Sequence, residues 1–73
     1  MLQLEAVHSS WVNAYAYDSG TLFLQFKDAR GVPTVTCQYD NVSLDLYLSF
    51  LSAGSKGRWV GRHLKGWNYT IVS

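Results

Sequence analysis

The chain has 73 residues, a formal net charge of +1 and one cysteine, and 48% of its residues are hydrophobic. A chain this short forms a single domain, 1–73, that buries only about 60% of its unfolded surface and needs a well-packed core. One cysteine excludes an internal disulfide, and the sequence shows neither a signal-peptide pattern nor a membrane-spanning apolar run. We expect a soluble, cytoplasmic protein without a membrane contact.

The charged residues are divided unevenly along the chain. All five acidic residues lie within the first 45 positions, whereas the segment from Leu46 to Ser73 contains no acid. That segment holds four of the six basic residues: Lys56, Arg58, Arg62 and Lys65. The asymmetry predicts an acidic partner for the C-terminal part of the chain.

Three segments in the first half have the character of β-strands. Residues 11–17 are rich in aromatic side chains, and residues 21–27 and 34–39 alternate between apolar and polar positions. The inward positions of the two alternating segments are Leu22, Leu24, Phe26, Val35, Cys37 and Tyr39. A short turn at 18–20, with Gly20 in the left-handed conformation, and a loop at 28–33 connect the strands. The segments predict a three-stranded antiparallel meander with one apolar face.

The facing of the segment 11–17 (WVNAYAY) is open from the sequence. Strict alternation puts Val12, Ala14 and Ala16 on one face. A bulge near Asn13-Ala14 would instead bring Tyr15 and Tyr17 to the side of Val12. At the other end of the chain, residues 67–72 have β character and could add an edge strand, while residues 1–10 give no firm signal.

A change of apolar period at about Val42 predicts that two helices follow the strands, which makes the fold α+β. Ser43 is the expected N-cap of the first helix, and Gly54 its C-cap. The stripe expected to cover the sheet is Leu44, Tyr47, Leu48 and Leu51. A second stripe contains Leu46, Phe50 and Ala53, and it needs cover from the second helix or from a dimer partner. We expect an exposed apolar patch at Leu46 and Phe50.

The second helix is expected from Lys56 to about Lys65, with Ser55 as its cap. Spacing of i, i+4 and i+7 puts three basic residues on one face: Arg58, Arg62 and Lys65. The opposite arc carries Trp59, Val60, His63 and Leu64. We expect His63 to lie at the edge of the core.

Two groups of residues, in order along the chain, carry a resemblance to a known family. The first group is Val7-x-Ser9-Ser10-x-Val12, then Tyr17-Asp18, then Leu22-x-Leu24-x-Phe26. The second is Ala53-x-Ser55-x-Gly57, then Trp59, then Leu64-Lys65. From Val7 to about Tyr69 the chain resembles a KTSC domain, a small module named from the C-terminus of some lysyl-tRNA synthetases and also found as stand-alone bacterial and phage proteins. The synthetase context makes RNA binding the function that the resemblance implies.

The chain departs from the family pattern at two places. The central Tyr-x-Tyr of the family is Cys37-Gln38-Tyr39 here, so no role of the earlier tyrosine carries over. The Val-Pro that usually opens the helix is Val42-Ser43, which replaces one helix-starting device with another.

Some residue types that catalysis uses are present. His8, Ser9, Ser10 and Asp18 have the side chains of a hydrolytic triad, and Cys37 with His63 those of a thiol enzyme. The sequence shows neither an oriented base nor an oxyanion site, and its His and Cys residues lack metal-ligand spacing. We therefore expect no enzyme, cofactor or metal site, and a Cys37 that acts as a small hydrophobic residue.

Two binding hypotheses remain. In the first, RNA phosphates contact Lys56, Arg58, Arg62 and Lys65, while Trp67 and Tyr69 stack on unpaired bases. In the second, the chain is a protein-interaction module, such as an adaptor or a phage-type inhibitor of a larger host complex. Its acidic partner would meet the same basic residues, or an apolar contact would form. That contact would involve Leu46 and Phe50, which could also serve a homodimer, or Tyr15 and Phe23 on the outer face of the sheet.

Overall fold

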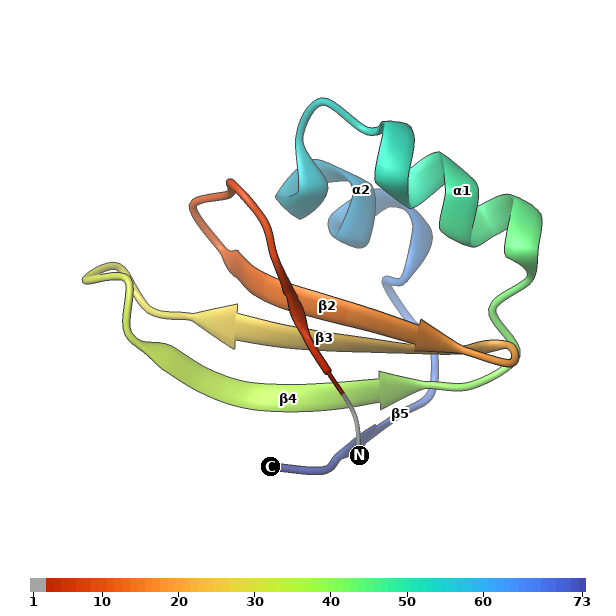
Figure 1. Ribbon diagram of the computed structural model, residues 1–73, viewed down its shortest axis with the longest axis horizontal. Helices are drawn as coiled ribbons and strands as arrows, with labels where there is room; N and C mark the ends of the chain where they lie inside the picture. Colours follow the sequence, from red (N-terminus) through yellow and green to blue (C-terminus); the bar gives the residue numbers. More distant parts are fainter. Residues whose placement is uncertain (1–2) are drawn as a thin grey trace.

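The computed structural model describes residues 3–73 as one antiparallel sheet that carries both helices on one of its faces (Figure 1). The strands lie in the sheet in chain order, from β1 to β5. The elements are β1 (Glu5–Ala6), β2 (Val12–Asp18), β3 (Thr21–Lys27), β4 (Pro33–Tyr39), α1 (Leu44–Ser52), α2 (Lys56–His63) and β5 (Tyr69–Ile71). The α+β class and the C-terminal edge strand are confirmed. The expectation of three strands before the helices is wrong, because four are present.

The additional strand, β1, is too short to show a pattern in the sequence. Its two residues pair with β2, with Glu5 opposite Tyr15 and Ala6 opposite Ala14. The backbone N–H of Val7 also donates to the carbonyl of Asn13 at 3.2 Å. A strand of two residues is too short for an alternation of apolar and polar side chains, so only its backbone bonds identify it.

A β-bulge decides the facing of β2. The pairing register of β2 against β3 shifts between Val12 and Ala14, and beyond the shift Tyr15 lies opposite Leu24. Directly opposite residues share a face of the sheet, so Tyr15 and its neighbour at i+2, Tyr17, lie on the same side as Leu24. The bulged alternative is therefore correct, and both tyrosines face the helices.

Positive backbone φ angles form the tight turn between β2 and β3. Ser19 has a φ of 50° and Gly20 a φ of 88°. Two successive residues with positive φ make a type I′ turn, whose twist matches that of the flanking strands. The left-handed conformation expected for Gly20 is confirmed.

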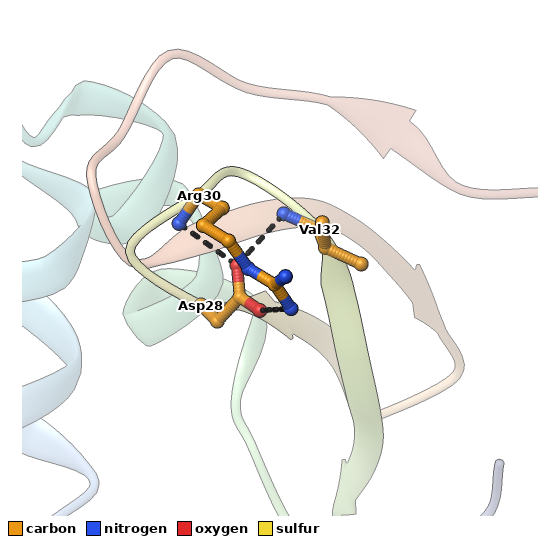
Figure 2. Close-up of polar contacts among 3 residues, drawn as sticks. All are labelled: Asp28, Arg30 and Val32. Carbon is orange, nitrogen blue, oxygen red and sulfur yellow. Dashed lines mark hydrogen bonds and ion pairs between the residues drawn. The ribbon is translucent and has the colours of Figure 1, made fainter.

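Asp28 organises the loop between β3 and β4 (Figure 2). Its Oδ1 accepts hydrogen bonds from the backbone N–H groups of Arg30 at 2.9 Å and Val32 at 3.0 Å. Its Oδ2 accepts from the guanidinium of Arg30 at 3.2 Å. The bond from the Val32 N–H is the main reason that the pKa of Asp28 is lowered, and the bonds from Arg30 add to it. These bonds hold a loop at the sheet end that is far from β5 in Figure 1.

The core lies between the sheet and the two helices. Phe50 of α1 is fully buried, with its ring centroid 5.3 Å from that of Tyr15 and 5.0 Å from that of Trp59. Tyr17 anchors the approach to α1, because its hydroxyl donates to the carbonyl of Val42 at 2.6 Å and its ring stacks on Tyr47 at 4.1 Å. The other core residues are Val12, Leu22, Leu24, Phe26, Cys37, Tyr39, Val42, Val60 and Leu64.

The prediction of which α1 residues cover the sheet is wrong for three of the four residues. Leu44, Leu48 and Leu51 are 59%, 47% and 39% exposed, and only Tyr47 of that stripe packs against the core. The core-facing stripe is instead Leu46, Phe50 and Ala53. The sheet and α2 cover the same side of α1, so its opposite side is left to solvent.

Candidate nucleic-acid interface

Serine side chains cap the starts of both helices. The hydroxyl of Ser55 accepts from the backbone N–H of Arg58 at 3.3 Å, and Ser43 caps α1 in the same way through Leu46 at 3.1 Å. Both N-cap predictions are confirmed. The C-cap residue of α1 is Ala53 rather than the expected Gly54, and α2 ends at His63, two residues earlier than expected.

One face of α2 is held in the core. Trp59, Val60 and Leu64 are buried, as the sequence predicts. The indole Nε1 of Trp59 donates to the hydroxyl of Ser49 on α1 at 2.9 Å, which fixes the rotation of one helix against the other. The orientation of the buried face determines which residues α2 presents to solvent.

The opposite face of α2 and its C-terminal turn is basic and exposed. Arg58, Arg62 and Lys65 all have exposed side chains. Within residues 3–73, the one ion pair joins Arg30 to Asp28 in the β3–β4 loop, so none of the three cations has a carboxylate partner there. The three-residue basic face consists of Arg58, Arg62 and Lys65, and its cations are available to an external anion.

Lys56 does not belong to this face, and its expected binding role is not supported by its contacts. Its Nζ donates to the carbonyl of Leu51 at 2.9 Å and to that of Ala53 at 2.8 Å. The ammonium also lies 5.4 Å from the ring centroid of Phe50. Lys56 therefore satisfies the C-terminal carbonyls of α1 and complements the negative end of its dipole.

The two aromatic candidates after α2 have different environments. Trp67 is half-buried, and its Nε1 donates to the backbone carbonyl of Asp40 at 2.8 Å. Tyr69 is 58% exposed, with its ring centroid 5.8 Å from that of the buried Tyr39. Of the two, Tyr69 presents the more accessible ring.

A cleft lies beside the basic face. It has a volume of about 390 Å³, and its lining residues are Trp11, Tyr39, Val60, Gly61, Leu64, Lys65, Gly66, Trp67 and Tyr69. Trp11 is 44% exposed and was not among the predicted site residues. No spacing rule links position 11 to positions 60–69, because the sheet and α2 bring them together only in the fold.

The prediction of an exposed apolar patch at Leu46 and Phe50 is wrong. Phe50 is 0% exposed, and Leu46 is half-buried against the core. The physical reason is the rotation of α1, which directs these two side chains toward the sheet and α2. The apolar surface that α1 does present is formed by Leu44, Leu48 and Leu51.

The contacts of Ser9, Cys37 and His63, which are residue types that catalysis uses, are as follows in the fold. The hydroxyl of Ser9 accepts from the backbone N–H groups of Trp11 at 3.2 Å and Val12 at 3.1 Å, so it holds the entry to β2. Cys37 is buried, as expected, and burial raises the pKa of its thiol. His63 is exposed rather than at the core edge, with its ring 4.9 Å from that of Trp59.

Two further properties concern the described part of the chain. No three His, Cys, Asp or Glu side chains among residues 3–73 are close enough together to hold a metal ion. None of the helices within those residues is long and apolar enough to cross a membrane.

Comparison with known proteins identifies the family. The model of the KTSC domain family matches residues 8–69. The fold is similar to the crystal structure of a KTSC domain protein from Yersinia pestis, with a TM-score of 0.85 and 29% sequence identity over 100% of both chains. A search of curated proteins finds no significant match. The resemblance inferred from the sequence is confirmed, and the chain belongs to the KTSC domain family.

Proposed function

We propose that this protein is a non-enzymatic RNA-binding module whose phosphate-binding surface is the basic face of α2. The observation that carries the proposal is the exposure of Arg58, Arg62 and Lys65 on one face, without a carboxylate partner among residues 3–73. Phosphate contacts from Lys and Arg supply most of the affinity of non-specific nucleic-acid binding.

The placement of the acids supports the same function. Asp28 is engaged with Arg30 in the β3–β4 loop, and Asp40 accepts side-chain bonds from Gln38 at 3.0 Å and Thr21 at 3.4 Å. Neither carboxylate lines the cleft beside α2. Among residues 3–73, no acidic residue lines the cleft that contains Lys65 or the hollow that contains Arg58 and Arg62. An acid near the cleft is Asp40, which lines an adjoining hollow together with Trp67 and Tyr69.

Titration of a labelled single-stranded RNA against the wild-type protein and charge variants tests the proposal. Arg58→Gln and Arg62→Gln should each weaken binding to every RNA sequence alike, because phosphate contacts carry no sequence information. Arg30→Gln is the control, since it removes the same charge from the β3–β4 loop, where Arg30 is paired with Asp28. Wild-type dissociation constants in the range of about 1–100 µM would fit non-specific binding near physiological salt. Equal weakening by all three variants, or no binding at all, would overturn the proposal.

The leucines of α1 favour a second function, binding to another protein. Leu44, Leu48 and Leu51 recur at i, i+4 and i+7 and are all exposed, so they form a continuous apolar stripe. In this case partner capture should survive nuclease treatment, and Leu48→Asp should abolish it while the fold stays intact. Capture that disappears with nuclease would leave RNA binding as the function.

A further inference from the structure

The cleft between α2 and β5 has an apolar floor and an aromatic rim. Val60, Leu64 and Tyr39 are buried and line its interior, with exposed fractions of 4%, 4% and 6%. Trp11 and Tyr69 line it with rings that are 44% and 58% exposed. At about 390 Å³ the cleft falls within the range of about 300–1,000 Å³ typical of small-ligand sites.

The aromatic rings around the cleft are held in place by the fold. The ring centroid of Trp11 lies 4.9 Å from that of Phe26, and Tyr69 lies 5.8 Å from Tyr39. Trp67 is fixed through its Nε1 bond to the carbonyl of Asp40. Rings that are already positioned lose little side-chain freedom when a planar group stacks on them.

The charge of the cleft indicates which chemical group a ligand would carry next to a planar ring stacked on the aromatic rim. Lys65 is its one charged lining residue. Arg62, three residues earlier, is exposed and lines a separate hollow together with Arg58. The chain continues from this end of α2 to β5 at the edge of the sheet (Figure 1). A ligand that combines a flat aromatic group with a neighbouring anion is complementary to this arrangement.

We propose that the cleft receives an unpaired base of single-stranded RNA, while Lys65 and Arg62 contact the adjoining phosphates. This inference rests on the proposed function and extends it, because it specifies single strands over duplexes. The bases of a duplex are paired and stacked on one another, so they cannot enter a cleft. Stacking on Trp11 or Tyr69 is tolerant of sequence, since every base has an aromatic face.

Gly61 offers a way to close the cleft without disturbing the fold. It lines the cleft, and a Cβ added there would meet no heavy atom within 4 Å. It lies within α2, where Ala and Leu are better helix formers than Gly. Gly61→Leu should therefore fill part of the cleft, whereas Gly61→Ala changes the helix propensity and fills little space.

The experiment measures the affinities of four labelled probes of equal length: single-stranded RNA, single-stranded DNA, duplex RNA and an abasic ribose-phosphate strand. The abasic strand keeps the phosphates and lacks the bases. The wild-type protein should bind the single-stranded RNA about 5- to 150-fold more tightly than the abasic strand, which is the range for one stacked base. Tyr69→Ala and Gly61→Leu should reduce that preference toward one, while Tyr69→Phe and Gly61→Ala should retain it. Chemical denaturation of each variant verifies that it is folded.

The outcomes separate this inference from the proposed function. Equal affinity for single-stranded, duplex and abasic probes, with no effect of Gly61→Leu, would overturn the cleft as a base site and leave phosphate binding by α2 intact. No binding of any probe would overturn both. Single-stranded DNA that binds about as tightly as RNA would support base stacking in the cleft, since the bases of both strands offer aromatic faces.

Discussion

At the scale of single residues, the position of Phe50 shows which side of α1 holds the fold together. The side chain is 0% exposed and contacts rings from both the sheet and α2, whereas Leu48 on the same helix is 47% exposed. Phe50→Ala should therefore lower the free energy of unfolding by about 3–5 kcal/mol, as truncation of a buried Phe does. Leu48→Ala should cost less than about 1 kcal/mol, because much of its surface is already in water.

Urea denaturation of both variants measures this difference. The predicted order of the two losses is opposite to the expectation from the sequence, which placed Leu48 and Leu51 against the sheet. A larger loss for Leu48→Ala than for Phe50→Ala would mean that α1 is rotated in solution relative to the structure.

Tyr39 makes the stability depend on alkaline pH. Burial raises the pKa of this phenol to about 12, with smaller contributions from Cys37 and Tyr69. In the unfolded chain its pKa is about 10, so between about pH 10 and 12 the unfolded state binds fewer protons than the folded state and stability falls as pH rises. A shift of about two units corresponds to roughly 3 kcal/mol at most, present below pH 10 and lost as pH passes the folded pKa.

Urea denaturation at about pH 9 and about pH 12 tests this dependence. The Tyr39→Phe variant has no phenol to ionise, so its stability should fall less between the two pH values than that of the wild-type protein. An identical decrease in both proteins would assign the loss to other groups.

At the scale of elements, Lys56 connects the end of α1 to the start of α2. Lys56→Met keeps an apolar stem near Phe50 but removes two hydrogen bonds to the carbonyls of Leu51 and Ala53. The variant should lose about 1–2 kcal/mol of stability, since a charged donor to exposed C-terminal carbonyls contributes about this much. Its affinity for RNA should stay close to that of the wild-type protein.

Lys65→Met provides the opposite case, because that exposed side chain has no such bonds in the structure. It should weaken RNA binding and leave the urea midpoint nearly unchanged. A reversal of these two patterns would return Lys56 to the binding surface.

The elements differ in how far the sequence could predict them. Alternation in 21–27 and the helical spacing after Ser43 predict β3 and the existence of α1, because each leaves a regular apolar pattern. The sequence cannot orient α1, because Leu44, Leu48 and Leu51 are as apolar as the stripe that is buried. The two-residue β1 leaves no pattern, and the bulge in β2 is decided by its pairing with β3.

The residues of the candidate site also differ in how far the sequence could predict them. Helical spacing is sufficient to predict that Arg58 and Arg62 share an exposed face, and Lys65 is exposed in the turn that follows α2. The contribution of Trp11 to the neighbouring cleft depends on the tertiary fold, as does the diversion of Lys56 to the carbonyls of α1. Local periodicity carries no information about either contact.

At the scale of the whole molecule, the fold separates a basic surface from an apolar one. The basic face of α2 and the leucine stripe of α1 belong to successive helices on the same side of the sheet (Figure 1). The single ion pair within residues 3–73 is in the β3–β4 loop, so it does not neutralise the basic face. We propose that the basic face binds phosphates.

The salt dependence of RNA affinity tests that claim most directly. Three phosphate contacts to a single strand, at about 0.7 each, predict a slope of about −2 for the logarithm of affinity against the logarithm of salt concentration. Arg62→Gln should make the slope shallower by about 0.7, while Arg30→Gln should leave it parallel to the wild-type line. A slope near zero, or the same change for Arg30→Gln as for Arg62→Gln, would contradict phosphate binding by α2.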